Sequence, residues 1–171
     1  MALCDNPGLS FDLLAKRGGV SRRTLYRLAP TREALFDLLR VHAVEATFAA
    51  LDKARLTERD ALTALEDITE DFLADAALYT FWVADTEIRR NDSSEKEKID
   101  EAFERYRTKM MLFFEKGQVE GVFRNDIPAS WLLEVYDCLL LAASRCRQTG
   151  NVAPNNLKQL VIETFRNGLT Q

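Results

Sequence analysis

The chain has 171 residues, of which 47% are hydrophobic and 29% are charged, and its formal net charge at pH 7 is −4. These values suit a globular domain with a sizeable core, and the few glycines and prolines exclude a disordered or collagen-like chain. The runs without a charged residue, such as Ala76–Ala84, are all far shorter than the ~20 residues of a membrane-spanning helix. Because no signal-peptide pattern follows Met1, we expect a cytoplasmic protein with no membrane partner.

Apolar residues recur every three or four positions along the chain, and no stretch shows the sustained alternation of a strand. Cap residues such as Ser21 and Thr31, and breakers such as Pro30, divide this pattern into segments. The predicted helices cover about residues 10–17, 21–28, 31–54, 57–75, 78–90, 94–119, 126–148 and 154–168. The sequence therefore predicts an all-α fold.

Cysteine and histidine usage argues against metal, redox and catalytic chemistry. Cys4 stands alone, and Cys138 and Cys146 lie about 12 Å apart if they share one helix, too far for a disulfide. The sequence has no CxxC pair and only one histidine, His42, without a recognisable partner for nucleophilic or metal chemistry. We expect no catalytic residue, no metal, no cofactor and no enzymatic activity.

Positive charge is concentrated near the N-terminus. Residues 1–40 carry a net charge of +3, whereas the rest of the chain carries −7. Between Ala15 and Arg32 there are six basic residues and no acidic one. A basic patch on an acidic protein is typical of a module that binds a polyanion, although a solvated surface would show the same composition.

The segment from Ser10 to Leu28 has the pattern of a helix-turn-helix unit. Gly19 allows the positive φ that a sharp turn between two helices needs, and Ser21 is a good cap for the second helix. On that helix one side is apolar and is predicted to pack on Leu13 and Leu14; it carries Val20, Leu25 and Leu28. The other side is polar and carries Arg22, Arg23, Tyr26 and Arg27. Such a helix suits the major groove of DNA, while a plain helical hairpin with a basic surface is the simpler alternative.

The string AKRGGVSRRTLYRLAPTREAL, from Ala15 to Leu35, resembles the signature of TetR-type transcriptional regulators. The resemblance implies a homodimeric repressor, with a DNA-binding domain in residues 1–45 and a helical effector-binding and dimerisation domain in residues 46–171. It places Ser10 at the start of the bracing helix and Ser21–Arg27 on the recognition helix. The DNA-contacting residues that it implies are Ser10, Ser21, Arg22, Arg23, Thr24, Tyr26, Arg27 and Arg32.

The sequence departs from the family pattern in three respects. Family members begin with a further helix of about four turns, of which only Met1–Asp5 could supply the last turn here. A histidine and an aromatic residue of the pattern are replaced by Leu28 and Ala29, and a glycine is replaced by Arg23. These departures predict a truncated, loosely packed head and an in-frame coding extension upstream of Met1.

The two C-terminal helices are candidates for a dimer interface. Between Ile127 and Ala143 only Glu134 and Asp137 are charged, so this helix must be covered on more than one side. The cover could be the core of the same subunit or a second subunit, and the resemblance favours the second. The interface residues expected are Leu133, Leu140, Leu160, Val161 and Phe165.

The middle helices are rich in aromatic residues, which could form a plain core or line a ligand pocket. Asp85 and Arg89, one turn apart, could hold a polar group of a ligand or pair at the surface. We expect a small apolar or aromatic effector. The binding residues expected are Phe81, Trp82, Asp85, Arg89, Tyr106, Met110, Phe114, Trp131 and Tyr136.

Two functional hypotheses follow from the sequence. The first is a TetR-like repressor that binds a palindromic operator as a dimer and releases it when a ligand binds. The second is a dimeric small-molecule-binding or interaction module whose truncated head no longer binds DNA.

Overall fold

The computed structural model describes the backbone of residues 9–90 and 96–169, and the side chains of residues 9–86 and 101–168. Within these ranges the regular structure is entirely helical, as the sequence predicts. The helices are α2 (Phe11–Arg17), α3 (Arg22–Leu28), α4 (Arg32–Ala54), α5 (Ala61–Ala74), α6 (Ala76–Arg90), α7 (Lys96–Val119), α8 (Ala129–Thr149) and α9 (Pro154–Leu169).

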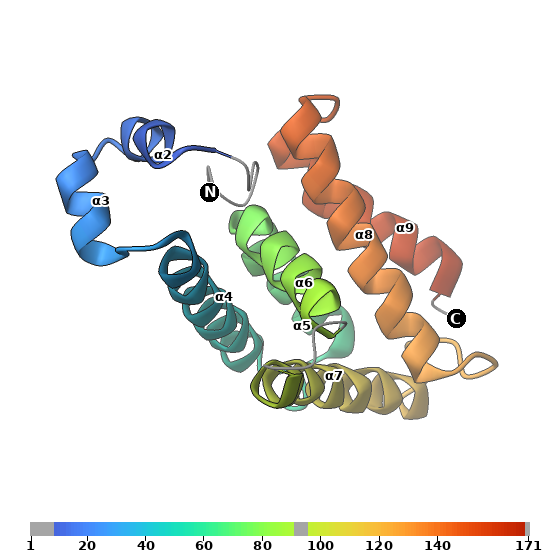
Figure 1. The fold of residues 1–171 in the computed structure, drawn as a ribbon. Helices are drawn as coiled ribbons and strands as arrows, with labels where there is room; N and C mark the ends of the chain where they lie inside the picture. The colour runs from blue at the N-terminus through green and yellow to red at the C-terminus, as the bar shows by residue number, and fades with distance from the viewer. Residues whose placement is uncertain (1–8, 91–95, 170–171) are drawn as a thin grey trace.

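The helices form a small head and a larger body (Figure 1). Helices α2 and α3 pack on each other and stand at one end of α4, whose 23 residues extend from the head along the body. In the body, α4 packs on α5 and α6, while α8 packs on α7 and α9. Since α4 belongs to both parts, any rotation of α4 against α5 and α6 also moves the head.

Most predicted helix ends are confirmed to within two residues, and two starts are corrected: α8 begins at Ala129, after Pro128, rather than at residue 126, and α5 also begins later than predicted. The segment after α4 begins its helix at Ala61 rather than at residue 57, because the side chain of Asp60 is the cap and accepts a hydrogen bond from the Thr63 N–H. The preceding helix, α4, ends at Ala54, and its C-cap Arg55 lies in the left-handed region with a φ of 50°. The predicted capping box at residues 94–97 begins outside the described residues.

Aromatic side chains form the centre of the body. One group joins α5, α6 and α7, where the ring centroids of Trp82 and Tyr106 lie 5.4 Å apart. A second group joins α7, α8 and α9, where the ring of Phe114 stacks on that of Phe165 at 5.7 Å. These rings are almost completely buried. They therefore hold the body helices together by burying large apolar areas.

Gly117, inside α7, allows the ring of Phe123 to lie close against the helix backbone. A Cβ added at Gly117 would overlap the ring of Phe123. That ring is fully buried and packs edge-on against Phe113, Phe114 and Phe165. The ring therefore has no free space into which it could retreat.

Gly117→Ala is consequently expected to destabilise the fold by about 1–3 kcal/mol, the usual cost of overpacking a core. Gly168→Ala is the matched control, because no atom outside its own chain neighbours lies within 4 Å of the added Cβ. The free energies of unfolding in urea measure both effects. Equal stability of the two variants would show that the Phe123 ring is not confined.

Candidate nucleic-acid interface

Two short capped helices and a glycine turn form the head. The Ser10 hydroxyl accepts a hydrogen bond from the Leu13 N–H at 3.4 Å, and the Ser21 hydroxyl accepts one from the Thr24 N–H at 3.0 Å. Between the helices, Gly19 has a φ of 65°, a conformation that glycine adopts without steric cost. The turn and both caps agree with the expected helix-turn-helix unit.

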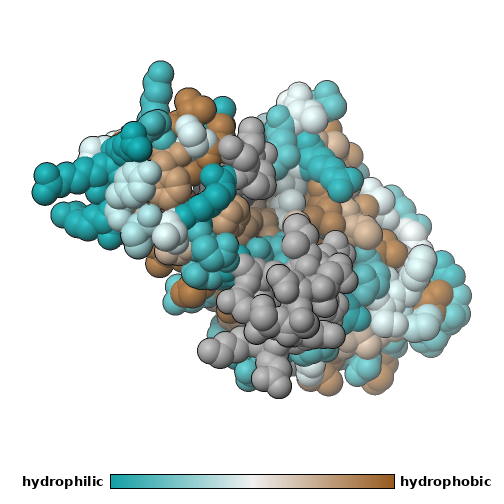
Figure 2. Space-filling view, in the orientation of Figure 1, coloured by the Kyte–Doolittle hydropathy of each residue, from teal (hydrophilic) through white to brown (hydrophobic). Residues whose placement is uncertain are grey.

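The outer face of α3 carries exposed positive charge. Arg23 and Arg27 are exposed, and neither has a hydrogen-bond or ion-pair partner within the described part of the chain. Figure 2 shows hydrophilic side chains projecting outward at this end of the molecule. These two guanidinium groups are therefore available to an external anion.

Arg22 and Tyr26 lie on the same helix but are held by neighbours. Arg22 pairs with Asp12 of α2 at 3.1 Å and lies over the ring of Tyr26, whose other contact is a stack on Phe11 at 4.8 Å. The hydrogen bond to Tyr26 and the charge of Asp12 raise the pKa of Arg22. The Thr24 hydroxyl is likewise engaged by the Ser21 hydroxyl at 2.8 Å. These contacts fix the orientation of α3 on α2.

Arg32, expected to contact a DNA phosphate, is directed back into the head. Its Nη1 donates to the Leu9 carbonyl at 2.8 Å, its Nη2 is buried without a partner among the described residues, and its guanidinium lies over the ring of Phe36. In this structure Arg32 links the start of the head to α4, and its contact with a DNA phosphate stays a prediction. The side chain is long enough to reach either a phosphate outside the head or the Leu9 carbonyl inside it. The position of Arg32 in the motif could therefore not decide between these two partners.

The small core of the head differs in membership from the one expected and comprises Leu9, Leu14, Ala15 and Leu25. Leu14 and Leu25 are buried between α2 and α3, but Leu13, Val20 and Leu28 are 47%, 40% and 61% exposed, which corrects their predicted packing. Each helix has only seven residues.

Two residues of α4 connect the head core to the body core. Phe36 and Leu39 pack against both clusters of buried residues, and the ring of Phe36 stacks on Phe81 of α6 at 5.9 Å. Next to them, Arg40 donates to Asp85 of α6 at 2.8 Å. Burial raises the pKa of Asp85, partly offset by Arg40. The head is thus coupled to α6 through one side of α4.

The expected ligand residues do not form one open pocket. Six of them fill the core and are at most 8% exposed: Phe81, Trp82, Tyr106, Met110, Phe114 and Tyr136. Trp131, in contrast, is 58% exposed on α8. Asp85 pairs with Arg40, and the side chain of Arg89 lies outside the described residues. The aromatic set is therefore mainly core.

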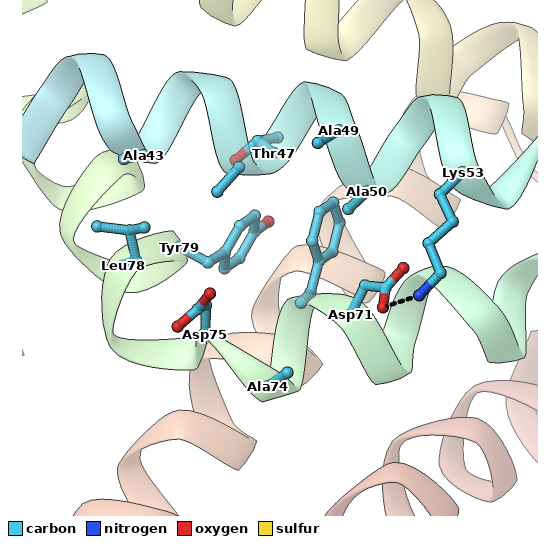
Figure 3. A pocket seen from close by; sticks show the side chains of 12 residues that line it. Ala43, Thr47, Ala49, Ala50, Lys53, Asp71, Ala74, Asp75, Leu78 and Tyr79 are labelled. Carbon is cyan, nitrogen blue, oxygen red and sulfur yellow. Dashed lines mark hydrogen bonds and ion pairs between the residues drawn. The ribbon is translucent and has the colours of Figure 1, made fainter.

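Two cavities of the body lie along α4, a helix on which no ligand residue was expected, although the expected residues Trp82 and Asp85 line one of them. One, a groove of about 310 Å³, lies between α4 and the junction of α5 with α6 and is drawn in Figure 3. Another of about 300 Å³ lies between α4, α6 and α7 and includes Asp85 and Trp82. The signal for the groove was present in the sequence: alanines at 43, 46, 49 and 50 leave room that larger side chains would fill.

The expected dimer residues are mostly directed inward. Leu133, Leu140, Val161 and Phe165 are at most 3% exposed within one subunit, so their side chains cannot form a surface for a partner. Of the expected set only Leu160 is exposed, at 47%. Because α8 is apolar on nearly all sides, its sequence could not separate the face that meets α7 and α9 from the outer face.

A buried polar cluster joins α6, α7 and α8. The Oδ1 atom of Asp137 accepts hydrogen bonds from the hydroxyls of Tyr79 at 2.8 Å and Tyr106 at 2.6 Å. Burial raises the pKa of Asp137 to about 6, while the two hydroxyls act in the opposite direction. Burial also raises the pKa values of both tyrosines, so they remain hydrogen-bond donors.

The described residues contain no group of three or more histidine, cysteine, aspartate or glutamate side chains arranged to hold a metal ion. None of the described helices combines the length and the hydrophobicity needed to cross a bilayer.

Known proteins resemble the chain over nearly its whole length. It is 27% identical over 168 residues to the HTH-type transcriptional regulator NfxB of Pseudomonas aeruginosa, which covers 98% of this chain and 88% of that protein. The structure of KstR2, a ketosteroid transcriptional regulator of Mycobacterium tuberculosis, superimposes with a TM-score of 0.78 at 15% identity, covering 99% of this chain and 89% of KstR2. No family model matches the chain.

A further similar structure is that of the TetR-like regulator LfrR of Mycobacterium smegmatis in complex with proflavine. Its TM-score is 0.70 at 20% identity, and the match covers 99% of this chain and 90% of LfrR. The proteins named here are transcriptional regulators, in agreement with the expectation that the chain is not an enzyme. The resemblance that the motif indicates is thus confirmed, and the chain has the all-α fold of the TetR-type transcriptional regulators.

Proposed function

We propose that the chain is a TetR-like, ligand-responsive repressor that acts in the cytoplasm as a homodimer on a palindromic operator. Residues 1–45 would bind DNA, and residues 46–171 would bind the effector and the second subunit. The observation that carries the proposal is the outer face of α3, where Arg23 and Arg27 are exposed without partners among the described residues. Ser21 caps α3 itself, and Ser10 caps α2, the helix on which α3 packs.

Electrostatics and geometry both support DNA as the partner of α3. An arginine can donate two hydrogen bonds to guanine in the major groove, and its charge displaces counterions from phosphates. In this arrangement Arg23 and Arg27 would contact DNA, while Arg22 and Tyr26 would support the helix and reach the backbone only by releasing Asp12 and Phe11.

The outer faces of α8 and α9 are the proposed dimer surface. Trp131, Val135, Cys138 and Ala142 follow one another at spacings of three and four along α8, so they share a face. Trp131 is 58% exposed and Leu160 of the adjoining α9 is 47% exposed. Large apolar side chains left exposed on neighbouring helices are characteristic of a protein–protein contact.

Trp131→Asp combined with Leu160→Asp is therefore expected to convert a dimer into a monomer, because each interface would bury four unpaired carboxylates. Sedimentation equilibrium measures the change in mass. Val119→Asp is the matched control, since Val119 is 89% exposed on α7. Wild-type protein that sediments as a monomer at micromolar concentration would contradict the proposed dimer.

The link from effector to DNA would pass through α4. A ligand between α4 and the body would change how α4 lies against α5 and α6, and Phe36 and Leu39 would transmit this change to the head core. In a dimer, a small rotation of each α4 would alter the separation of the two α3 helices. Binding to two half-sites depends directly on that separation.

The proposal is tested by titrating DNA from upstream of the chain's own gene with the purified protein at several salt concentrations. We expect retardation that weakens steeply with salt, because the contacts include phosphates. Protein that dimerises but does not retard this DNA at any salt concentration would instead support the alternative, a binding module without DNA recognition.

A further inference from the structure

The groove between α4 and the α5–α6 junction has an apolar floor and an acidic edge (Figure 3). Small side chains of α4, among them Thr47 and Ala50, form one wall. The opposite wall includes the aromatic pair Phe72 and Tyr79, whose rings stack at 4.9 Å. Its volume of about 310 Å³ lies at the lower end of the ~300–1,000 Å³ typical of small-molecule sites.

The charges that line the groove are unbalanced. Asp71 and Asp75 are acidic, and Lys53 is the one basic residue among the lining residues that the structure describes. The ammonium of Lys53 already pairs with Oδ1 of Asp71 at 2.6 Å. Asp75 is exposed at the opening, between Ala74 and the start of α6. The lining therefore carries one negative charge in excess.

One carboxylate oxygen of the groove lacks a partner. Oδ2 of Asp71 is buried and accepts no hydrogen bond from any described residue. A buried carboxylate oxygen without a donor is unfavourable, because it has lost its hydration without gaining a hydrogen bond in exchange. A positively charged group in the groove would be attracted to this carboxylate and to Asp75 through its charge, whereas an anionic ligand would be repelled.

We infer that this groove is the effector site, and that it takes a small organic cation: an ammonium group facing Asp71 and Asp75, attached to an apolar or aromatic body that lies along α4. The inference deepens the ligand-responsive part of the proposed function and rests on it for its regulatory consequence. It narrows the expected apolar or aromatic effector to one that carries positive charge.

The test uses two probes of one shape and different charge. Benzyltrimethylammonium carries a quaternary nitrogen where neopentylbenzene carries a quaternary carbon, so the two probes share one shape and differ in charge and in the hydration that the charge brings. We expect calorimetry on the full chain to show binding of the ammonium roughly tenfold or more tighter than of the hydrocarbon, as one ion pair near a protein surface provides. Equal affinities, or no binding of the ammonium, would overturn the inference.

Variants locate the site. Asp75→Asn is expected to weaken ammonium binding roughly tenfold, because it removes a negative charge that would lie ~4 Å or a little farther from the ammonium nitrogen. Glu70→Gln is the control of equal charge: Glu70 is exposed beside the groove residues but pairs with Lys158 at 2.6 Å. Ala46→Trp, which fills the groove, is expected to abolish binding while the circular dichroism spectrum stays helical. Unchanged binding in both Asp75→Asn and Ala46→Trp would place the ligand elsewhere and overturn the inference.

The calorimetry tests the groove and the DNA titration tests the proposed function, so either proposal can fail without the other. Ammonium binding without DNA binding would uphold the groove and refute the proposed function. DNA binding without ammonium binding would refute the groove and leave the regulator intact. If both occur, adding benzyltrimethylammonium is expected to release the DNA, and release that persists in Asp75→Asn at the same concentration would count against this site.

Discussion

Replacing Arg23 and Arg27 together by glutamine is expected to weaken DNA binding by at least about 100-fold. Each arginine that contacts a base or phosphate contributes ~1–3 kcal/mol, and a dimer loses two in each half-site. Glutamine has a similar helix propensity, so the change removes the guanidinium group and its charge without disfavouring α3 itself. Fluorescence anisotropy with a labelled duplex measures the loss.

The salt dependence of the same titration separates two roles for these residues. Each phosphate contact that is removed lowers the slope of log K against log salt by about 0.9. A shallower slope in the double variant would assign the arginines to phosphates, and an unchanged slope with lower affinity would assign them to bases. In either case the affinity must fall.

Arg55→Gln with Lys109→Gln is the matched control, because it removes two positive charges from the body. Both residues are exposed near the far end of α4, where they pair with Glu58 and Asp52. This control is expected to retain affinity within a few-fold. If it weakens binding as much as the α3 variant does, general charge and not the face of α3 governs the interaction.

Asp137→Asn is expected to stabilise the protein at neutral pH. In the folded state burial raises the pKa of Asp137 from the ordinary value of 3.8 to about 6. Between these two pH values the folded state holds more protons than the unfolded state. The free energy of unfolding therefore falls as pH rises through this window, by about 3 kcal/mol, and stays constant above it.

The asparagine variant lacks this fall, because its amide does not ionise and its carbonyl oxygen can accept the same hydrogen bonds from Tyr79 and Tyr106. At pH 7.5 it is expected to be up to about 3 kcal/mol more stable than the wild type, and at pH 4 the two should be similar. Urea denaturation across this range gives the difference. Glu134→Gln removes an exposed carboxylate from the same helix but keeps Asp137, so it should keep the fall of stability with pH that the wild type shows. An asparagine variant less stable than the wild type at pH 7.5 would contradict the account.

The helices were predictable because their end signals are local. Ser21, Thr31 and Gly150 act within one turn of themselves, so the sequence around each is sufficient to place a helix end. The outer face of α3 followed from the same local pattern, since Arg23 and Arg27 lie opposite the buried Leu25.

The side-chain environments in the body were less predictable, because they depend on the packing of several helices. Leu140 is buried and Trp131 is exposed on the same helix, although a scale of hydrophobicity treats both as apolar. The groove exists because the alanine side chains of α4 are small, whereas large aromatic residues were expected to line the ligand site. Arg32 illustrates a third limit, because a long flexible side chain can turn toward solvent or toward a nearby carbonyl.

The most direct test of the central claim, that α3 of this chain recognises DNA, is selection of duplexes from a random-sequence pool. The account predicts that wild-type protein enriches sequences with two inverted half-sites whose centres lie about one helical turn, or a multiple of it, apart. It also predicts that Arg23→Gln with Arg27→Gln enriches none. A wild-type pool as random as that of the double variant would contradict the claim.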